Sequence, residues 1–177
     1  ALIDMGLRGE GVAKYRQMFA VDGTYTEGQF MAAATALEEA REHDMALQAY
    51  DKVLASAKDV SLKARAMLGR ARSLRGQKKF SEARKLLEGF INDKDLSKLQ
   101  LVVDANMLLV EVASEEGKDE RDDNERTKLF NVAVDSLKMV KRYRTTPKEM
   151  AELDLMAGEM LLRKMEAEKA LGLDAQS

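Results

Sequence analysis

The feature that most constrains the fold of this chain is a thirteen-residue segment that occurs twice. The two copies are residues 64–76 and 105–117, and both end in glycine. The matching positions are mostly apolar and three or four residues apart, the spacing of one buried helix face. Two helices built on one pattern predict a protein of repeated helical units. The matched pairs are Ala64 with Ala105, Met67 with Leu108, Leu68 with Leu109, Ala71 with Val112, and Ser73 with Ser114.

The composition favours helix along the whole chain. Helix formers such as Ala, Leu, Glu, Lys, Arg and Met dominate, aromatic residues make up 5%, and Pro147 is the only proline among 177 residues. Strands favour β-branched and aromatic residues instead. With 45% hydrophobic and 34% charged residues, the chain is typical of a globular protein with a charged surface. An all-α fold is therefore predicted.

Apolar periodicity divides the chain into three helix hairpins, one helix before them and one after. The hairpins are predicted at about residues 27–58, 61–92 and 97–142, the first helix at 12–21 and the terminal helix at 147–171. In the terminal helix we expect one buried face. Its members are Met150, Leu153, Met156, Ala157, Met160 and Leu161. We interpret residues 1–177 as a single helical domain.

Residues that satisfy free backbone groups predict the helix ends. Thr146, Pro147 and Glu149 form the pattern of a capping box with proline at the first helical position. A glycine that ends a helix commonly adopts the left-handed conformation, which is predicted for Gly76. Gly117 is predicted to stop the next long helix. Further N-caps are predicted at Thr24 (with Glu27), Asp44, Ser61, Ser81 and Ser97.

The hairpins resemble the tetratricopeptide repeat over roughly residues 27–142. Leu68, Gly69 and Gly76 stand at the relative places of the Leu-Gly pair and the later glycine of its first helix. The alanine, aromatic and small residues of its second helix correspond to Ala46, Tyr50 and Val53, and more loosely to Ala83 and Leu87, and to Ala133, Leu137 and Val140. The turn from Gly76 to Ala83 is longer than in the family, and the proline that commonly ends each repeat is absent.

This resemblance implies a right-handed α-solenoid of antiparallel helix hairpins, with the outer helices as caps. In this family the first helices of successive hairpins line a concave groove that holds peptides. Lys63, Arg70 and Ser73 would then face the groove from one hairpin, and Glu111 and Ser114 from the next. The expected function is a protein–protein interaction scaffold or adaptor. The asparagines of the family's groove for terminal carboxylates are not matched here.

Charge is unevenly distributed along the chain. Residues 63–85 contain nine basic residues and one acid, whereas residues 111–125 contain eight acids and two basic residues. Two interpretations follow: solvated faces that attract each other across neighbouring hairpins, or a basic groove for an acidic protein or peptide. Nucleic-acid binding by the basic hairpin is an alternative with less support, since only Phe80 could stack a base there. A regulatory or accessory subunit of a larger complex is another.

No set of residues predicts catalysis, a cofactor or a metal site, so the chain is not expected to be an enzyme. His43 is the only histidine and there is no cysteine, which leaves too few ligands for a zinc site. We expect a structural role for His43. No signal peptide and no membrane-spanning segment is visible, so a soluble protein is expected, in the cytoplasm or the periplasm. The sequence does not indicate an oligomeric state.

Overall fold

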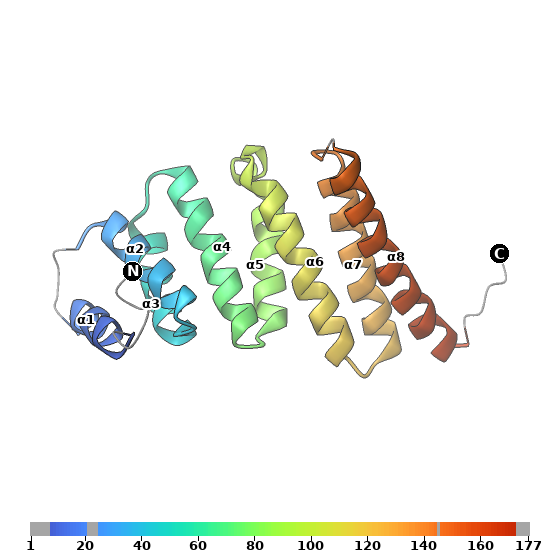
Figure 1. The fold of residues 1–177 in the computed structure, drawn as a ribbon, viewed down its shortest axis with the longest axis horizontal. Helices are drawn as coiled ribbons and strands as arrows, with labels where there is room; N and C mark the ends of the chain where they lie inside the picture. Colours follow the sequence, from blue (N-terminus) through green and yellow to red (C-terminus); the bar gives the residue numbers. More distant parts are fainter. Residues whose placement is uncertain (1–7, 21–24, 145, 173–177) are drawn as a thin grey trace. The chain divides into compact units, whose positions relative to one another are not determined.

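The computed structural model describes residues 8–20, 25–144 and 146–172, and over these residues the all-α prediction is confirmed (Figure 1). Eight α-helices and one short 3-10 helix are described, each packed against neighbours along the chain. None of these helices is both long and apolar enough to cross a membrane. The chain divides into two compact units, Ala1–Lys79 and Phe80–Ser177, and the boundary falls inside the predicted hairpin 61–92.

Unit 1 contains α1 (Arg8–Ala20), α2 (Glu27–Glu39), α3 (His43–Ser56) and α4 (Val60–Gly76). Helix α3 packs against both α2 and α4, and these two also touch each other. The core of the unit combines one residue of α1 with the facing stripes of the other helices. It consists of Val12, Ala34, Leu37, Ala46, Ala49, Tyr50, Val53 and Ala66.

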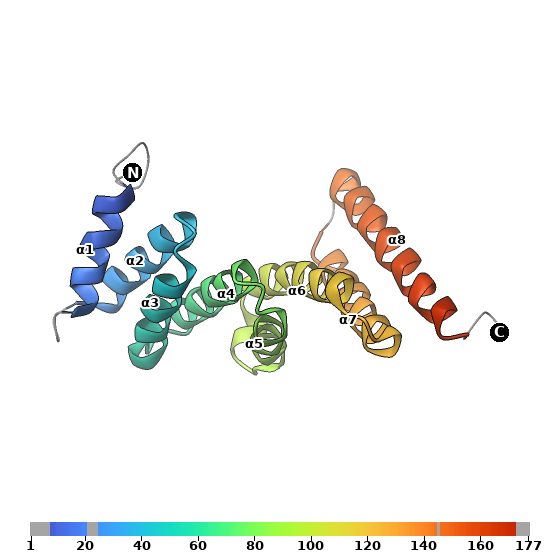
Figure 2. The same cartoon turned by 90° about the horizontal axis from the view of Figure 1, so that it is seen from below.

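Unit 2 contains α5 (Phe80–Asn92), the 3-10 helix η1 (Leu96–Lys98), α6 (Leu101–Asp119), α7 (Asp123–Lys141) and α8 (Pro147–Ala170). The α-helices of this unit pack in chain order, α5 on α6, α6 on α7 and α7 on α8 (Figures 1 and 2). Helix α6 is buried on most of its circumference because it lies between two neighbours. Helix α8 is the outermost helix of the unit and buries a single narrow stripe, Leu153, Met160 and Ala167.

The positions of several N-caps differ from those predicted. Thr26, not Thr24, caps α2, with Gln29 completing the capping box, while Thr24 lies outside the described residues. Helix α4 is capped by Asp59, whose carboxylate accepts a hydrogen bond from Leu62 N at 2.6 Å, so the cap predicted at Ser61 is wrong. The predicted cap at Thr146 is confirmed: its hydroxyl accepts from Glu149 N, and Pro147 is the first helical residue.

Three other predicted caps are also wrong, because each of these residues lies inside a helix and not directly before one. Asp44 and Ser81 already belong to the first turns of α3 and α5, and Ser97 belongs to η1. Helix α6 continues to Asp119, two residues beyond Gly117. Gly76 is the last residue of α4 and is not left-handed, because the left-handed residue of that turn is Lys78.

The turns that end α2 and α4 share one backbone geometry. Arg41 and Lys78 both have a positive φ, of 61° and 59°. In each turn the next amide bonds to a carbonyl five residues earlier, Glu42 N to Leu37 O and Lys79 N to Leu74 O, both at 2.9 Å. This is the Schellman pattern, in which a left-handed residue lets the chain satisfy carbonyls at the helix end. Two non-glycine residues therefore adopt an uncommon conformation at equivalent places.

Candidate functional site

The clearest close approach between helices is the Tyr50–Gly69 contact in unit 1. A Cβ at Gly69 of α4 would lie 2.1 Å from Tyr50 Cζ of α3, so only glycine leaves room for the ring. The Tyr50 hydroxyl donates to Glu38 Oε2 of α2 at 2.6 Å, and Arg72 Nε of α4 donates to Glu38 Oε1 at 2.5 Å. Burial, together with this bond to Glu38, raises the pKa of Tyr50. One polar network thus joins three helices.

His43 lies against the end of α4 in the same manner. A Cβ at Gly76 would be 2.4 Å from His43 Cε1 and Nε2, so the imidazole occupies the place of a side chain. Asp44 next to it accepts a hydrogen bond from Gln77 Nε2 at 2.6 Å. In the part of the chain that the structure describes, no group of three or more possible metal ligands gathers. The position of His43 fits a packing role between α3 and α4.

The residues predicted to line a groove in unit 1 have different environments on α4. Lys63 is exposed, near the beginning of the helix. Arg70 Nε lies 2.8 Å from Asp51 Oδ1 of α3, an ion pair whose N–H geometry falls short of a hydrogen bond. Ser73 is fully buried, so its hydroxyl is not accessible at the surface of the unit. Lys63 and Arg70 therefore remain the surface candidates of this helix.

In unit 2, Glu111 and Ser114 lie on α6. Ser114 is buried, like its sequence equivalent Ser73, because the repeated pattern places both on a packed face. Glu111 is half-buried, one turn beyond Met107. Met107 lines a cavity of about 200 Å³ between α6, α7 and α8, together with Val140, Arg144, Glu149, Glu152, Leu153 and Met156. The cavity is smaller than the roughly 300–1,000 Å³ of small-molecule sites, so it does not point to a small ligand.

The basic and acidic segments of the chain meet within unit 2. Arg84 Nε of α5 donates to Glu116 Oε2 of α6 at 2.7 Å, and Arg84 also pairs with Glu88. The bond to Glu116 raises the pKa of the Arg84 guanidinium, although partial burial opposes this. This contact agrees with the interpretation in which the two charged segments attract each other. Part of the charge of these two segments is therefore engaged in ion pairs within unit 2.

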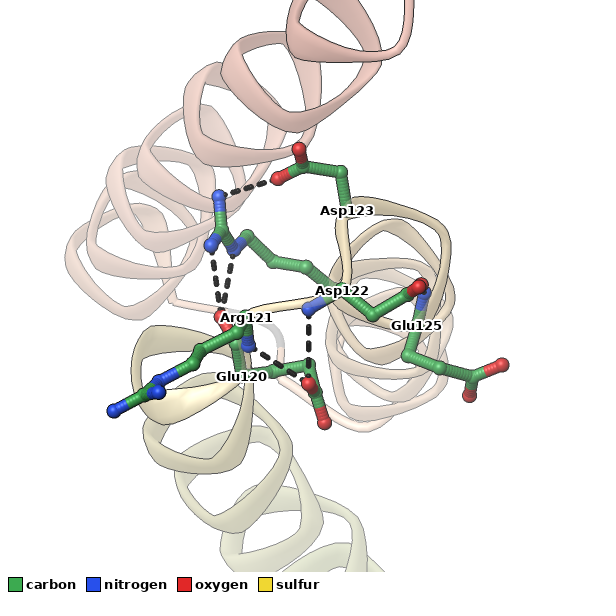
Figure 3. Close-up of polar contacts among 6 residues, drawn as sticks. Glu120, Arg121, Asp122, Asp123 and Glu125 are labelled. Atoms are coloured by element: carbon green, nitrogen blue, oxygen red, sulfur yellow. Dashed lines mark hydrogen bonds and ion pairs between the residues drawn. The ribbon is translucent and has the colours of Figure 1, made fainter.

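Figure 3 shows the acidic loop between α6 and α7, with Glu120, Asp122 and Asp123, and the polar contacts of this loop centre on Arg126. The Arg126 guanidinium donates two hydrogen bonds to the carbonyl of Glu120 at the end of α6, at 2.8 and 3.2 Å, and pairs with Asp123 at 2.7 Å. Asp122 caps α7 by accepting from Glu125 N at 2.9 Å. These carboxylates lie at the N-terminus of α7, where negative charge is favourable. The loop thus needs its acids for its own structure.

A surface that the sequence analysis missed lies on α8, facing away from α7. Leu155, Leu162 and Met165 are exposed by 77%, 63% and 61%. Leu161, predicted to be buried, is 44% exposed, because α8 buries only one stripe and Leu161 lies outside it. The heptad spacing of Ala151, Leu155, Gly158, Leu162 and Met165 could have revealed a second apolar face in the sequence.

Comparisons with known proteins give no further constraint on this site. No family model matches the chain, and neither curated proteins nor solved structures give a significant match.

Proposed function

We propose that this chain is a tetratricopeptide-like helical repeat protein whose function is to hold another protein. The observation that carries the proposal is a triad that is buried three times on alternate helices. On α3, α5 and α7 an alanine is followed by larger buried residues four and seven positions later. The triads are Ala46, Tyr50 and Val53; Ala83, Leu87 and Phe90; and Ala133, Leu137 and Val140, all exposed by 2% or less.

Spacing along the chain supports the same proposal. The first two triads are 37 residues apart at every position, and so are the left-handed residues Arg41 and Lys78. Small residues at helix crossings allow close approach, and the larger neighbours fill the gap to the next helix. Most helix contacts in each unit are between neighbours along the chain, with α2 and α4 as an added pair, which is the pattern expected of a repeat protein. A right-handed solenoid of such units, capped by α1 and α8, is the architecture we propose.

Repeat proteins of this kind use their extended surface for binding, which is the reason for proposing a scaffold or adaptor. The surface candidate in unit 1 is the basic part of α4, with the exposed Lys63 and the half-buried Arg70. Basic side chains there would attract an acidic protein segment and raise its association rate. We do not assign Ser73 or Ser114 to this surface because both are buried.

Affinity capture with the intact chain tests this function. The bait is the native protein, compared with a variant carrying Lys63→Glu and Arg70→Gln. Glutamine is chosen at 70 because a carboxylate there would repel Asp51. The matched control carries Lys78→Glu and Lys79→Glu, which changes exposed charges in the turn after α4.

We expect nuclease-treated extract to yield an acidic protein that the native chain and the turn variant capture and the α4 variant does not. With the purified partner, the α4 variant should then associate at least about tenfold more slowly at low salt. Capture that disappears with nuclease treatment would instead establish the nucleic-acid alternative. Equal capture by all three baits would show that α4 is not the binding surface.

A further inference from the structure

The outer face of α8 is an apolar seam without a covering helix in the described part of unit 2 (Figure 2). We use the name "α8 outer face" for Ala151, Leu155, Gly158, Leu162 and Met165. Their spacings are four, three, four and three residues, the heptad pattern by which one helix packs along another. All five are exposed, whereas the opposite stripe of α8 is buried on α7. Single exposed apolar residues need no explanation, but a continuous seam indicates a contact surface.

Gly158 is compatible with such a contact, because no packing in the described structure requires a glycine there. It lies in the middle of a 24-residue helix, where glycine is unfavourable relative to alanine. A Cβ at this position would meet nothing within 4 Å, so neither packing nor backbone conformation requires glycine here. Glycine at the centre of the seam would leave room for a partner helix to approach closely, as Gly69 leaves room for the Tyr50 ring in unit 1.

Acidic residues flank the α8 outer face on both sides. Glu152, Glu159 and Glu166 each follow a small or flexible member of the seam by one position. Asp154 precedes Leu155 on the other side. Glu166 has no ion-pair partner among the described residues, whereas Glu152 pairs with Lys148, Asp154 with Lys141 and Glu159 with Arg163. In a helix pair, the positions beside the seam select the partner by charge.

This charge pattern argues against a second copy of the chain as the occupant. In an antiparallel pair of α8 helices, Glu152 would face Glu166 of the other copy, and Glu159 would face its equivalent. In a parallel pair, Asp154 would face Glu159. Like charges at these positions disfavour association, so complementarity requires a partner with basic flanks. An anionic membrane surface is disfavoured for the same reason.

We propose that the α8 outer face binds an amphipathic helix of another protein, with leucine-type residues along its apolar seam and lysine or arginine beside it. The site goes beyond the scaffold function proposed for α4, since it lies in the other unit and takes a partner of opposite charge. Leu155 and Leu162 would be the main apolar contacts, Gly158 the point of closest approach, and the three glutamates the source of charge selectivity.

The test uses the intact chain and three labelled synthetic helical peptides of equal length. One has a leucine heptad seam flanked by lysines, the second has the same seam flanked by glutamates, and the third has the composition of the first in scrambled order. We expect binding of the lysine peptide, measured by fluorescence anisotropy, to be at least about tenfold tighter than binding of either control. No binding of the lysine peptide, or equal binding of the glutamate peptide, would overturn the proposal.

Variants place the bound peptide on the structure. Gly158→Leu should weaken binding by about tenfold or more, because the new side chain occupies the point of closest approach; the helix content should stay intact, since a Cβ at this position meets nothing within 4 Å. Leu162→Ser should act in the same direction. The matched control is Val60→Ser, at an exposed apolar residue of α4, which should bind like the native chain. Unchanged binding by Gly158→Leu would overturn the assignment to this face.

Two further measurements distinguish other occupants of the same face. If sedimentation shows a dimer that Leu162→Ser dissociates, a second copy is the occupant and the proposal fails. Binding to anionic phospholipid vesicles that Leu162→Ser abolishes would likewise replace the helix by a membrane. The charge variants of α4 should not change peptide binding, so failure at one surface leaves the other surface separately testable.

Discussion

The ring of Tyr50 lies directly over Gly69, closer than any side chain at position 69 would permit. The ring cannot move aside easily, because it is fully buried and its hydroxyl is held by Glu38. Gly69 therefore sets how closely α3 and α4 approach, and with it the position of Arg72 on α4. The contact links a glycine of the repeated segment to the polar network of unit 1.

Gly69→Ala should destabilise unit 1 by about 1–3 kcal/mol, because overpacking against Tyr50 exceeds the gain in helix propensity. Gly89→Ala is the matched control. Gly89 lies within α5, and a Cβ there meets nothing within 4 Å, so alanine should stabilise unit 2 by about 0.5–1 kcal/mol. Native-state hydrogen exchange distinguishes the two units. Unchanged stability of unit 1 in Gly69→Ala would contradict the close contact between Gly69 and Tyr50.

Tyr50→Phe should destabilise unit 1 by about 1–2 kcal/mol at neutral pH, because the Glu38 carboxylate loses a hydrogen bond inside the unit. The pKa of Tyr50 is raised in the folded state, above an ordinary value of about 10. The unfolded chain therefore releases this proton first as the pH rises. The stability that the raised pKa contributes is complete below pH of about 10 and decreases above it.

The difference in free energy of unfolding between the native chain and Tyr50→Phe should accordingly become smaller above pH of about 10. Denaturant unfolding of both proteins from neutral to alkaline pH measures this difference. The other titratable groups are the same in both proteins, so their contributions cancel. The difference in tyrosinate absorbance between the two proteins should appear only when the chain unfolds. A constant stability difference across the range would disprove the pKa shift.

Asp59→Ala should destabilise α4 by about 1 kcal/mol, because its carboxylate caps the Leu62 amide. Ser61→Ala should change stability by no more than about 0.5 kcal/mol, since Ser61 is exposed and already inside the helix. Urea unfolding monitored by circular dichroism compares the two. The opposite ranking would restore Ser61 as the cap.

Arg126→Ala should destabilise unit 2 by about 1–2 kcal/mol, because the carbonyl of Glu120 loses two hydrogen bonds and Asp123 loses its ion pair. Arg121→Ala is the control from the same loop. Arg121 is exposed, and the described residues give its guanidinium no ion-pair partner. Hydrogen exchange at the ends of α6 and α7 reports the effect. Equal exchange in both variants would mean that Arg126 does not organise the loop.

The sequence by itself determined the all-α fold and the approximate helix limits, because apolar periodicity and the Thr146-Pro147 signal are local. It also identified the buried triads, such as Ala46, Tyr50 and Val53, because their spacing marks one helix face. The N-caps at Thr26 and Asp59 were missed, since neighbouring polar residues compete for the role and the path of the entering chain selects one.

Only the tertiary structure decided which neighbour each face meets. Gly76 packs against His43 of the preceding helix, whereas its equivalent Gly117 contacts Phe130 of the following helix. Periodicity groups residues on a face but does not say whether another helix covers it. Ser73 is therefore buried, although it was predicted to line a groove, and Leu162 is exposed despite its apolar side chain. Burial depends on the partner that packs there, which no local pattern specifies.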